Sequence, residues 1–199
     1  MKVGVIGSGV VAQTLGAGFL KHGHEVAMGT RDPAKLEDGR RKIGALRSSL
    51  SRNIRRLRRR RGAGGRRRSR ARRLEAGRRR SPIGAGPPVD GVLSFFTTLK
   101  DSLMERLQKA YPSAHFVKAF NSVGNAQMVN PHFAGGRPTM FICGNNDNAK
   151  RVVRQILDQF GWDTEDMGAV EAIEPLCMLW CIPGVGRGDW SPHAFKLLR

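Results

Sequence analysis

The sequence has few acidic and aromatic residues and no long apolar run, and each shortage limits what the chain can be. Its 199 residues include 16 Asp and Glu against 35 Lys and Arg, and 7% are aromatic. No stretch approaches the roughly 18 apolar residues that a membrane-spanning helix needs. Residues 1–11 are apolar but interrupted by three glycines, and they lack a small-residue cleavage pattern. This argues against a signal peptide.

Cysteine is also scarce, with only Cys143, Cys177 and Cys181. An odd number in a chain of this length argues against a disulfide framework and fits the reducing cytoplasm, which is the expected location. No His or carboxylate cluster accompanies the cysteines, so no metal site is expected.

The surplus of positive charge comes from one segment, Gly39–Arg80. That segment holds twenty Lys and Arg, one acid (Glu75) and no aromatic residue, a net charge of +19. The whole chain also carries +19, so the other 15 basic and 15 acidic residues cancel. The basic surplus therefore says little about the partners of the flanking regions.

Those flanks alternate between strand and helix patterns, which predicts an α/β fold with a mostly parallel sheet. The expected strands are residues 2–6, 25–28, 115–120, 139–143 and 162–167. The expected helices are residues 10–22, a second beginning at Asp32-Pro33, and then 99–110, 148–160 and 169–181. Gly23 is expected to cap the first helix.

The first turn, Gly7-Ser8-Gly9-Val10-Val11-Ala12, fits the pattern G-x-G-x-x-G/A of a dinucleotide-binding turn. Gly7 permits the tight turn, Gly9 lets the backbone approach a pyrophosphate, and Ala12 is small enough for close packing of helix on strand. The helix N-terminus then offers unpaired N–H groups to the phosphates. A purely structural turn is the alternative.

The end of the second strand selects the cofactor. A carboxylate there would bind the ribose 2′-hydroxyl of NAD, but this chain has Thr30 and Arg31, which suit a 2′-phosphate. We therefore expect NADP. An exposed loop arginine is the alternative for Arg31, and a shift of two residues would turn Asp32 from a helix cap into a ribose ligand.

The turn, the run Thr30–Pro33, the run Phe116–Asn121 and the segment Glu174–Trp180 together resemble one family. It is the NADP-binding oxidoreductase family that includes the deazaflavin (coenzyme F-420)-dependent NADP reductases. The resemblance covers residues 1–38 and roughly 81–199. It implies a Rossmann-like, doubly wound sheet with a small C-terminal extension, in which hydride passes between the nicotinamide and a deazaflavin ring.

The resemblance also implies roles for individual residues. Ser8, Gly9, Val10 and Val11 would line the pyrophosphate, and Thr30 and Arg31 the 2′-phosphate. Lys118, Ala119, Phe120 and Asn121 would lie near the nicotinamide. Asn121 would be the polar group that orients the nicotinamide for catalysis, with a strand-end turn residue as the alternative.

The predicted organisation has three parts: residues 1–38 as the first βαβ unit, the Arg-rich segment 39–80, and the rest of the Rossmann domain with its extension in 81–199. The Arg-rich segment replaces the expected central strands 3 and 4 with a basic helix or disordered chain. It is read as out-of-frame sequence from a G/C-rich gene, as a natural disordered insert, or as an arm for nucleic acid or acidic membranes.

The predicted function is transfer of hydride between NADP(H) and a deazaflavin- or flavin-like acceptor, compromised to an unknown degree by the basic segment. Two alternatives stay open. One is an NADP-binding protein without turnover, and the other is a nucleic-acid-associated protein that uses the basic arm. A homodimer is compatible with the sequence, which does not identify the acceptor.

Overall fold

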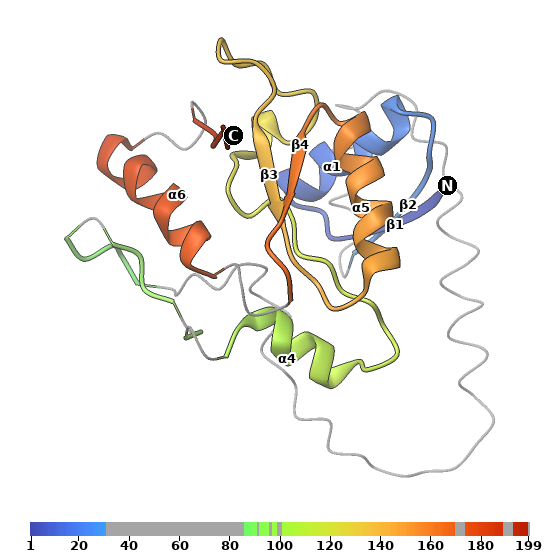
Figure 1. Cartoon of the computed structure of the whole chain (residues 1–199), viewed down its shortest axis with the longest axis horizontal. Helices are drawn as coiled ribbons and strands as arrows, with labels where there is room; N and C mark the ends of the chain where they lie inside the picture. The colour runs from blue at the N-terminus through green and yellow to red at the C-terminus, as the bar shows by residue number, and fades with distance from the viewer. Residues whose placement is uncertain are drawn as a thin grey trace. The chain divides into compact units, whose positions relative to one another are not determined.

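The computed structural model describes residues 1–30, 86–90, 92–95, 97–98, 101–169, 174–188 and 193–198 (Figure 1). They belong to two compact units, Met1–Leu74 and Glu75–Arg199, and each unit is described by itself. The Arg-rich segment, the helix expected at Asp32-Pro33 and the predicted replacement of strands 3 and 4 lie outside the described residues.

The first unit contains a β-strand, a helix and a second, parallel strand. These are β1 (Lys2–Ile6), α1 (Val10–Lys21) and β2 (Glu25–Gly29). Lys2 pairs with Glu25 and the register continues to Ile6 opposite Gly29. Gly23 follows α1 with φ of +78°, as expected of a glycine that ends a helix.

One face of this strand pair forms the core of the first unit. Buried Ala12 of α1 packs against buried Val26 and Met28 of β2. On β1, the residues of the opposite parity, such as Ile6 at 85% exposure, are open. Side chains of a strand alternate between its two faces, so α1 covers the face of the pair that carries Val26 and Met28.

The second unit contains a second parallel pair joined by a helix: β3 (Thr139–Ile142), α5 (Asp147–Gln159) and β4 (Asp163–Asp166). Figure 1 shows β3 and β4 side by side with α5 running along them. Every residue of β3 is buried, as expected of a parallel strand covered on both faces. Asn146 begins α5 by accepting a 2.9 Å hydrogen bond from the Ala149 amide.

Helix α4 (Leu103–Ala110) begins four residues later than the sequence predicted. The predicted cap, Thr97 or Thr98, is wrong, because Ser102 caps the helix instead. The Ser102 hydroxyl accepts a hydrogen bond from the Glu105 amide at 3.1 Å, and the Glu105 carboxylate accepts one from the Ser102 amide at 2.6 Å. This reciprocal capping box satisfies two amides that otherwise lack intrahelical partners.

The strand predicted at residues 115–120 is not formed. Its only pairing among the described residues is an isolated antiparallel bridge, in which Lys118 and Cys143 exchange backbone hydrogen bonds of 3.0 and 3.3 Å. The extended run stops at Phe120 because that residue has φ of +60°, which takes the chain out of the strand conformation.

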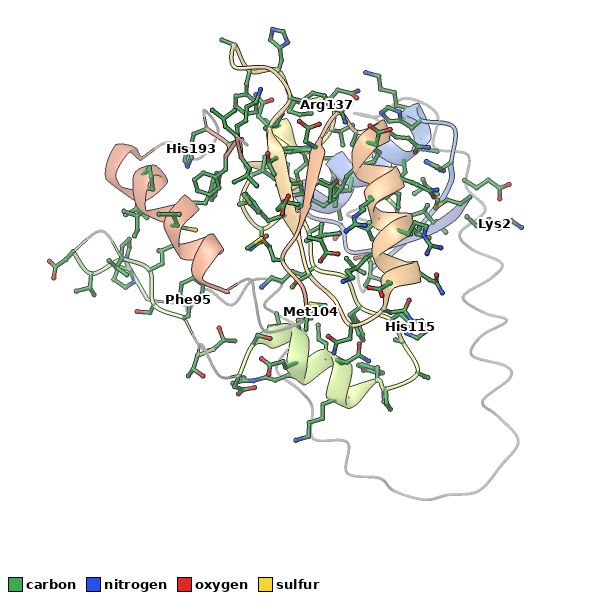
Figure 2. All side chains as sticks on the ribbon, viewed as in Figure 1. Lys2, Phe95, Met104, His115, Arg137 and His193 are labelled. Atoms are coloured by element: carbon green, nitrogen blue, oxygen red, sulfur yellow. The ribbon has the colours of Figure 1, made fainter. Side chains whose placement is uncertain are left out.

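The last helix is also displaced from its predicted range. Helix α6 (Glu174–Arg187) begins five residues later than expected and continues through Pro183. Buried Trp180 and Cys181 pack with Leu93 and with Phe95, which Figure 2 labels in this unit. This tertiary packing stabilises the helix past a residue that ordinarily ends one.

The C-terminal residues are held against the same unit. The Trp180 and His193 rings stack with centroids 5.0 Å apart. The Trp180 indole N–H donates to the His193 carbonyl, and His193 Nε2 lies within hydrogen-bonding distance of the Trp180 carbonyl oxygen. The Thr139 amide donates to the Phe195 carbonyl at 2.8 Å. The tail thus closes over the start of β3.

The predicted α/β class with parallel strands is confirmed. The described strands form two separate two-stranded sheets, each with its connecting helix. Within the described part of the chain, no helix is both long enough and apolar enough to cross a membrane.

Candidate functional site

The turn between β1 and α1 has the geometry of an anion site. Gly7 is buried and has φ of +137°, a conformation that favours glycine. Its amide donates to the Gly29 carbonyl at 2.6 Å, which fixes the turn beside the end of β2. Helix α1 follows, and its N-cap is Gly9, which has no side chain with which to cap the first amides.

Gly9 is the residue that distinguishes the two interpretations of this turn, an anion site and a purely structural turn. Its φ of −77° and ψ of 172° suit any residue, and an added Cβ would meet nothing within 4 Å. Nothing in the described fold therefore requires glycine here. A phosphate drawn up against the first amides of α1 would require it, because a Cβ would occupy that space. The residues present fit a pyrophosphate.

Two further hydrogen bonds hold this turn in shape. The Gln13 side-chain amide donates to the Ser8 carbonyl at 3.0 Å. The Thr30 hydroxyl donates to the Ser8 hydroxyl at 3.1 Å. The second contact joins the predicted pyrophosphate turn to the residue predicted to bind the 2′-phosphate, although they lie 22 positions apart in the sequence.

The remaining predicted residues of the first unit surround the same turn. Val10 and Val11 are 59% and 39% exposed, whereas Ala12 is buried against β2. The exposed pair leaves the N-terminus of α1 accessible, and the small buried side chain lets α1 pack closely. Arg31 lies outside the described residues.

The second unit contains an apolar pocket of about 230 Å³ between α4 and residues 116–119. Figure 2 shows Met104 on α4 and His115 at the start of the opposite wall. The pocket is lined by the following residues: Leu103, Met104, Leu107, Phe116, Val117, Lys118 and Ala119. Two residues that the sequence predicted near the nicotinamide, Lys118 and Ala119, thus line one cavity.

The predicted segment turns sharply after the pocket. Phe120 does not line the cavity; its amide donates to the Met140 sulfur at 3.2 Å, and its ring lies 6.3 Å from that of Phe160. Asn121, the predicted catalytic residue, follows and is half-buried, and Ser122 after it is buried.

Sequence reasoning placed Leu103 and Leu107 on the inward face of a helix but did not associate them with a pocket. Met140 and Phe160 were missed altogether. Neither has a local signal, because both act on residues 116–121 from elements 20 or more positions away. The helical spacing of the apolar residues in α4 was the one sequence signal that could have indicated that this helix lines a pocket.

Close packing fixes residues 116–118 against the chain that follows β3. A Cβ added to Gly144 would lie 2.6 Å from the Phe116 carbonyl oxygen and 3.4 Å from the Val117 Cα. Only a residue without a side chain allows this approach. The pocket wall is therefore positioned by backbone contacts as well as by the Lys118–Cys143 bridge.

A charged network ties α5 to the end of β4. Asp166 contacts Lys150 at 3.1 Å and Arg154 at 2.7 Å. Partial burial works to raise the pKa of Asp166, but the hydrogen bond from the Gly168 amide and the two nearby cations outweigh it, so the pKa lies below its usual range. Hydrogen bonds to Asp166 and then to Asp147 raise the pKa of Lys150. Asp166 and Lys150 are therefore both ionised at neutral pH.

A smaller ion pair joins Asp101, just before α4, to Arg106 within the helix, at 2.6 Å. Hydrogen bonds from Arg106 lower the pKa of Asp101, and the same contact raises the pKa of Arg106. In the described part of the chain, no group of three or more His, Cys, Asp or Glu side chains could hold a metal ion.

Comparison with known families bears on this geometry. Residues 2–56 match the family model described as NADP oxidoreductase, coenzyme F420-dependent. The predicted family resemblance is confirmed over these residues, and the cofactor predicted from Thr30 and Arg31 is the one that the family uses. The match ends inside the Arg-rich segment, beyond residue 38, and does not extend to residues 81–199, the other part of the predicted resemblance.

Two solved structures have a similar fold. One, from Arthrobacter sp. FB24, is described as a candidate F420-dependent NADP reductase, with 24% identity, a TM-score of 0.70 and full coverage of both chains. The other is a hypothetical protein from Sinorhizobium meliloti, with 18% identity, a TM-score of 0.53 and coverage of 99% of this chain and 94% of that one. No curated protein sequence matches.

Proposed function

We propose that this protein is an NADP(H)-dependent oxidoreductase that transfers hydride between NADP(H) and a deazaflavin- or flavin-like acceptor. The observation that carries the proposal is the turn at the start of α1, where the N-cap Gly9 has open space beside it and no side chain of its own to cap the helix. The partial positive charge of a helix N-terminus favours a phosphate there. The family matched by residues 2–56 supports NADP as that ligand.

The choice of NADP over NAD rests on the end of β2. We propose that Thr30 and Arg31 bind the 2′-phosphate. Thr30 already contacts Ser8 at 3.1 Å, so its hydroxyl lies beside the pyrophosphate turn. An arginine can bind a phosphate through two parallel hydrogen bonds, which makes it the stronger of the two groups.

When bound, NADPH would supply a hydride, two electrons and a hydrogen nucleus, from C4 of its nicotinamide to the acceptor ring. The protein then has to orient the rings, and it needs little acid–base chemistry of its own, because the proton that completes the reduced acceptor can come from solvent. We propose that Lys118, Ala119, Phe120 and Asn121 serve the nicotinamide end of the site, with Asn121 as the orienting polar group.

We further propose that the pocket along α4 takes an apolar part of the acceptor. Six of its seven lining residues are apolar or aromatic, and the other is Lys118. At about 230 Å³ it is smaller than the roughly 300–1,000 Å³ of pockets that enclose a drug-sized ligand. It therefore suits one ring or one edge of a larger acceptor rather than a whole tricyclic molecule.

Oxidation of NADPH, followed by the loss of absorbance at 340 nm, tests the proposal. We expect turnover with a deazaflavin or riboflavin as acceptor, and we expect it to fall when Leu107→Trp fills the pocket. The conservative variant Leu107→Met is the matched control. If the protein binds NADPH but oxidises it with neither acceptor, it is a binding protein without turnover and the proposed reaction is wrong.

A further inference from the structure

The backbone at Phe120 has a conformation that its own side chain disfavours. Its φ of +60° lies in the left-handed region, where a Cβ crowds the following carbonyl oxygen. Bulky residues adopt this conformation only when their surroundings enforce it, and such residues cluster at functional sites. Phe120 lies between Ala119, which lines the pocket, and Asn121. The contacts that enforce its conformation therefore also set the position of these two neighbours.

The register of the neighbouring bridge shows what is unusual at Phe120. Lys118 and Cys143 exchange both backbone hydrogen bonds, so a continued antiparallel ladder would next join Phe120 to Phe141. Instead the Phe120 amide donates to the side-chain sulfur of Met140, at 3.2 Å. A thioether is a weak acceptor, but it is the acceptor that satisfies this amide after the ladder has ended.

Both groups that hold Phe120 are themselves fixed. Met140 is 0% exposed in the middle of β3, and Phe160, whose ring lies 6.3 Å from that of Phe120, is 0% exposed at the end of α5. Well-packed interiors leave such side chains little freedom to move. Phe120 is thus held at its amide by β3 and at its ring by the residue that ends α5.

We infer that Met140 is a positioning residue, whose sulfur holds the turn at Phe120 and so sets the placement of Lys118, Ala119 and Asn121. This role rests on the proposed function, in which that segment serves hydride transfer. Met140 is fully buried and does not line the pocket, so we expect it to touch neither cofactor nor acceptor. Its loss should therefore affect turnover more than it affects the affinity for NADPH.

The test replaces Met140 by leucine, which keeps the volume and removes the acceptor sulfur. We expect the Phe120 amide to exchange with solvent deuterium at least tenfold faster, as measured by NMR, and kcat for NADPH oxidation to fall at least fivefold. The Kd for NADPH should change less than twofold. The matched control is Met128→Leu, also at a buried methionine, whose sulfur makes no hydrogen bond among the described contacts.

Replacing Phe120 by glycine provides a second arm, because glycine adopts left-handed φ without steric cost. In the Phe120→Gly background, Met140→Leu should lower kcat less than it does in the unaltered protein. Unchanged exchange at Phe120, or an equal effect of Met128→Leu, would overturn the inference. Absent turnover in the unaltered protein would instead overturn the proposed function, since the exchange measurement needs no activity.

Discussion

Replacing Gly9 by alanine tests the proposed phosphate site without disturbing the fold. The new Cβ would meet nothing within 4 Å, and the φ of −77° suits alanine. We expect a loss of stability of only about 0.5–1 kcal/mol, the difference between glycine and alanine as a helix N-cap. The same Cβ would stand where the phosphate has to approach the first amides of α1.

The expected loss of affinity follows from the hydrogen bonds at risk. A hydrogen bond from an amide to a charged group contributes about 1.5–3 kcal/mol. Losing one such bond would raise the Kd for NADPH about 10- to 150-fold, since each 1.4 kcal/mol is about tenfold. Quenching or enhancement of NADPH fluorescence measures this Kd, and urea unfolding measures the stability in parallel.

Gly4→Ala is the matched control. Gly4 lies in β1, and a Cβ there also meets nothing within 4 Å, but it is outside the turn. Alanine should leave the Kd unchanged and raise stability slightly, because glycine weakens strand interiors by about 0.5–1 kcal/mol. Unchanged NADPH affinity in Gly9→Ala, or equal weakening in both variants, would refute the reasoning.

Three further predictions concern the second unit. Gly144→Ala should lower the free energy of unfolding by about 1–3 kcal/mol in urea, because its Cβ would lie 2.6 Å from the Phe116 carbonyl oxygen. Trp162→Phe should cost about 1–3 kcal/mol and lower Tm, because the buried Met128 carbonyl loses its 2.9 Å hydrogen bond from the indole. The lowered pKa of Asp166 means that its contribution is present above an unfolded-state pKa near 4 and is lost as pH falls through the folded-state pKa. Asp166→Asn should therefore destabilise the protein at pH 7 by about 0.5–1 kcal/mol and much less at pH 3. Equal destabilisation at both pH values would contradict the ion-pair account.

Residues 1–30 of the first unit could be predicted almost residue by residue, because their signals are local. A run of β-branched residues predicts β1, and helical spacing followed by Gly23 predicts α1 and its end. The glycines of the turn predict its shape, and Gly7 and Gly23 do have positive φ. What the sequence did not reveal is the Ser8–Thr30 contact, which depends on the parallel pairing of β1 with β2.

The second unit was harder to predict because long-range contacts decide it. Residues 115–120 have the composition of a strand, yet Phe120 leaves that conformation with its amide bonded to Met140, twenty positions away. Helix α6 starts after Gly168, whose φ is +94°, and it continues past Pro183, where buried Trp180 packs against the rest of the unit. Local propensity predicted an earlier start and an earlier end.

Comparing the affinities of the unaltered protein for NADPH and NADH by fluorescence titration tests the central claim most directly. The account predicts saturable binding of NADPH at one site, at least tenfold tighter than that of NADH, because Thr30 and Arg31 are proposed to bind the 2′-phosphate that NADH lacks. Failure of NADPH to bind, or binding no tighter than that of NADH, would contradict it.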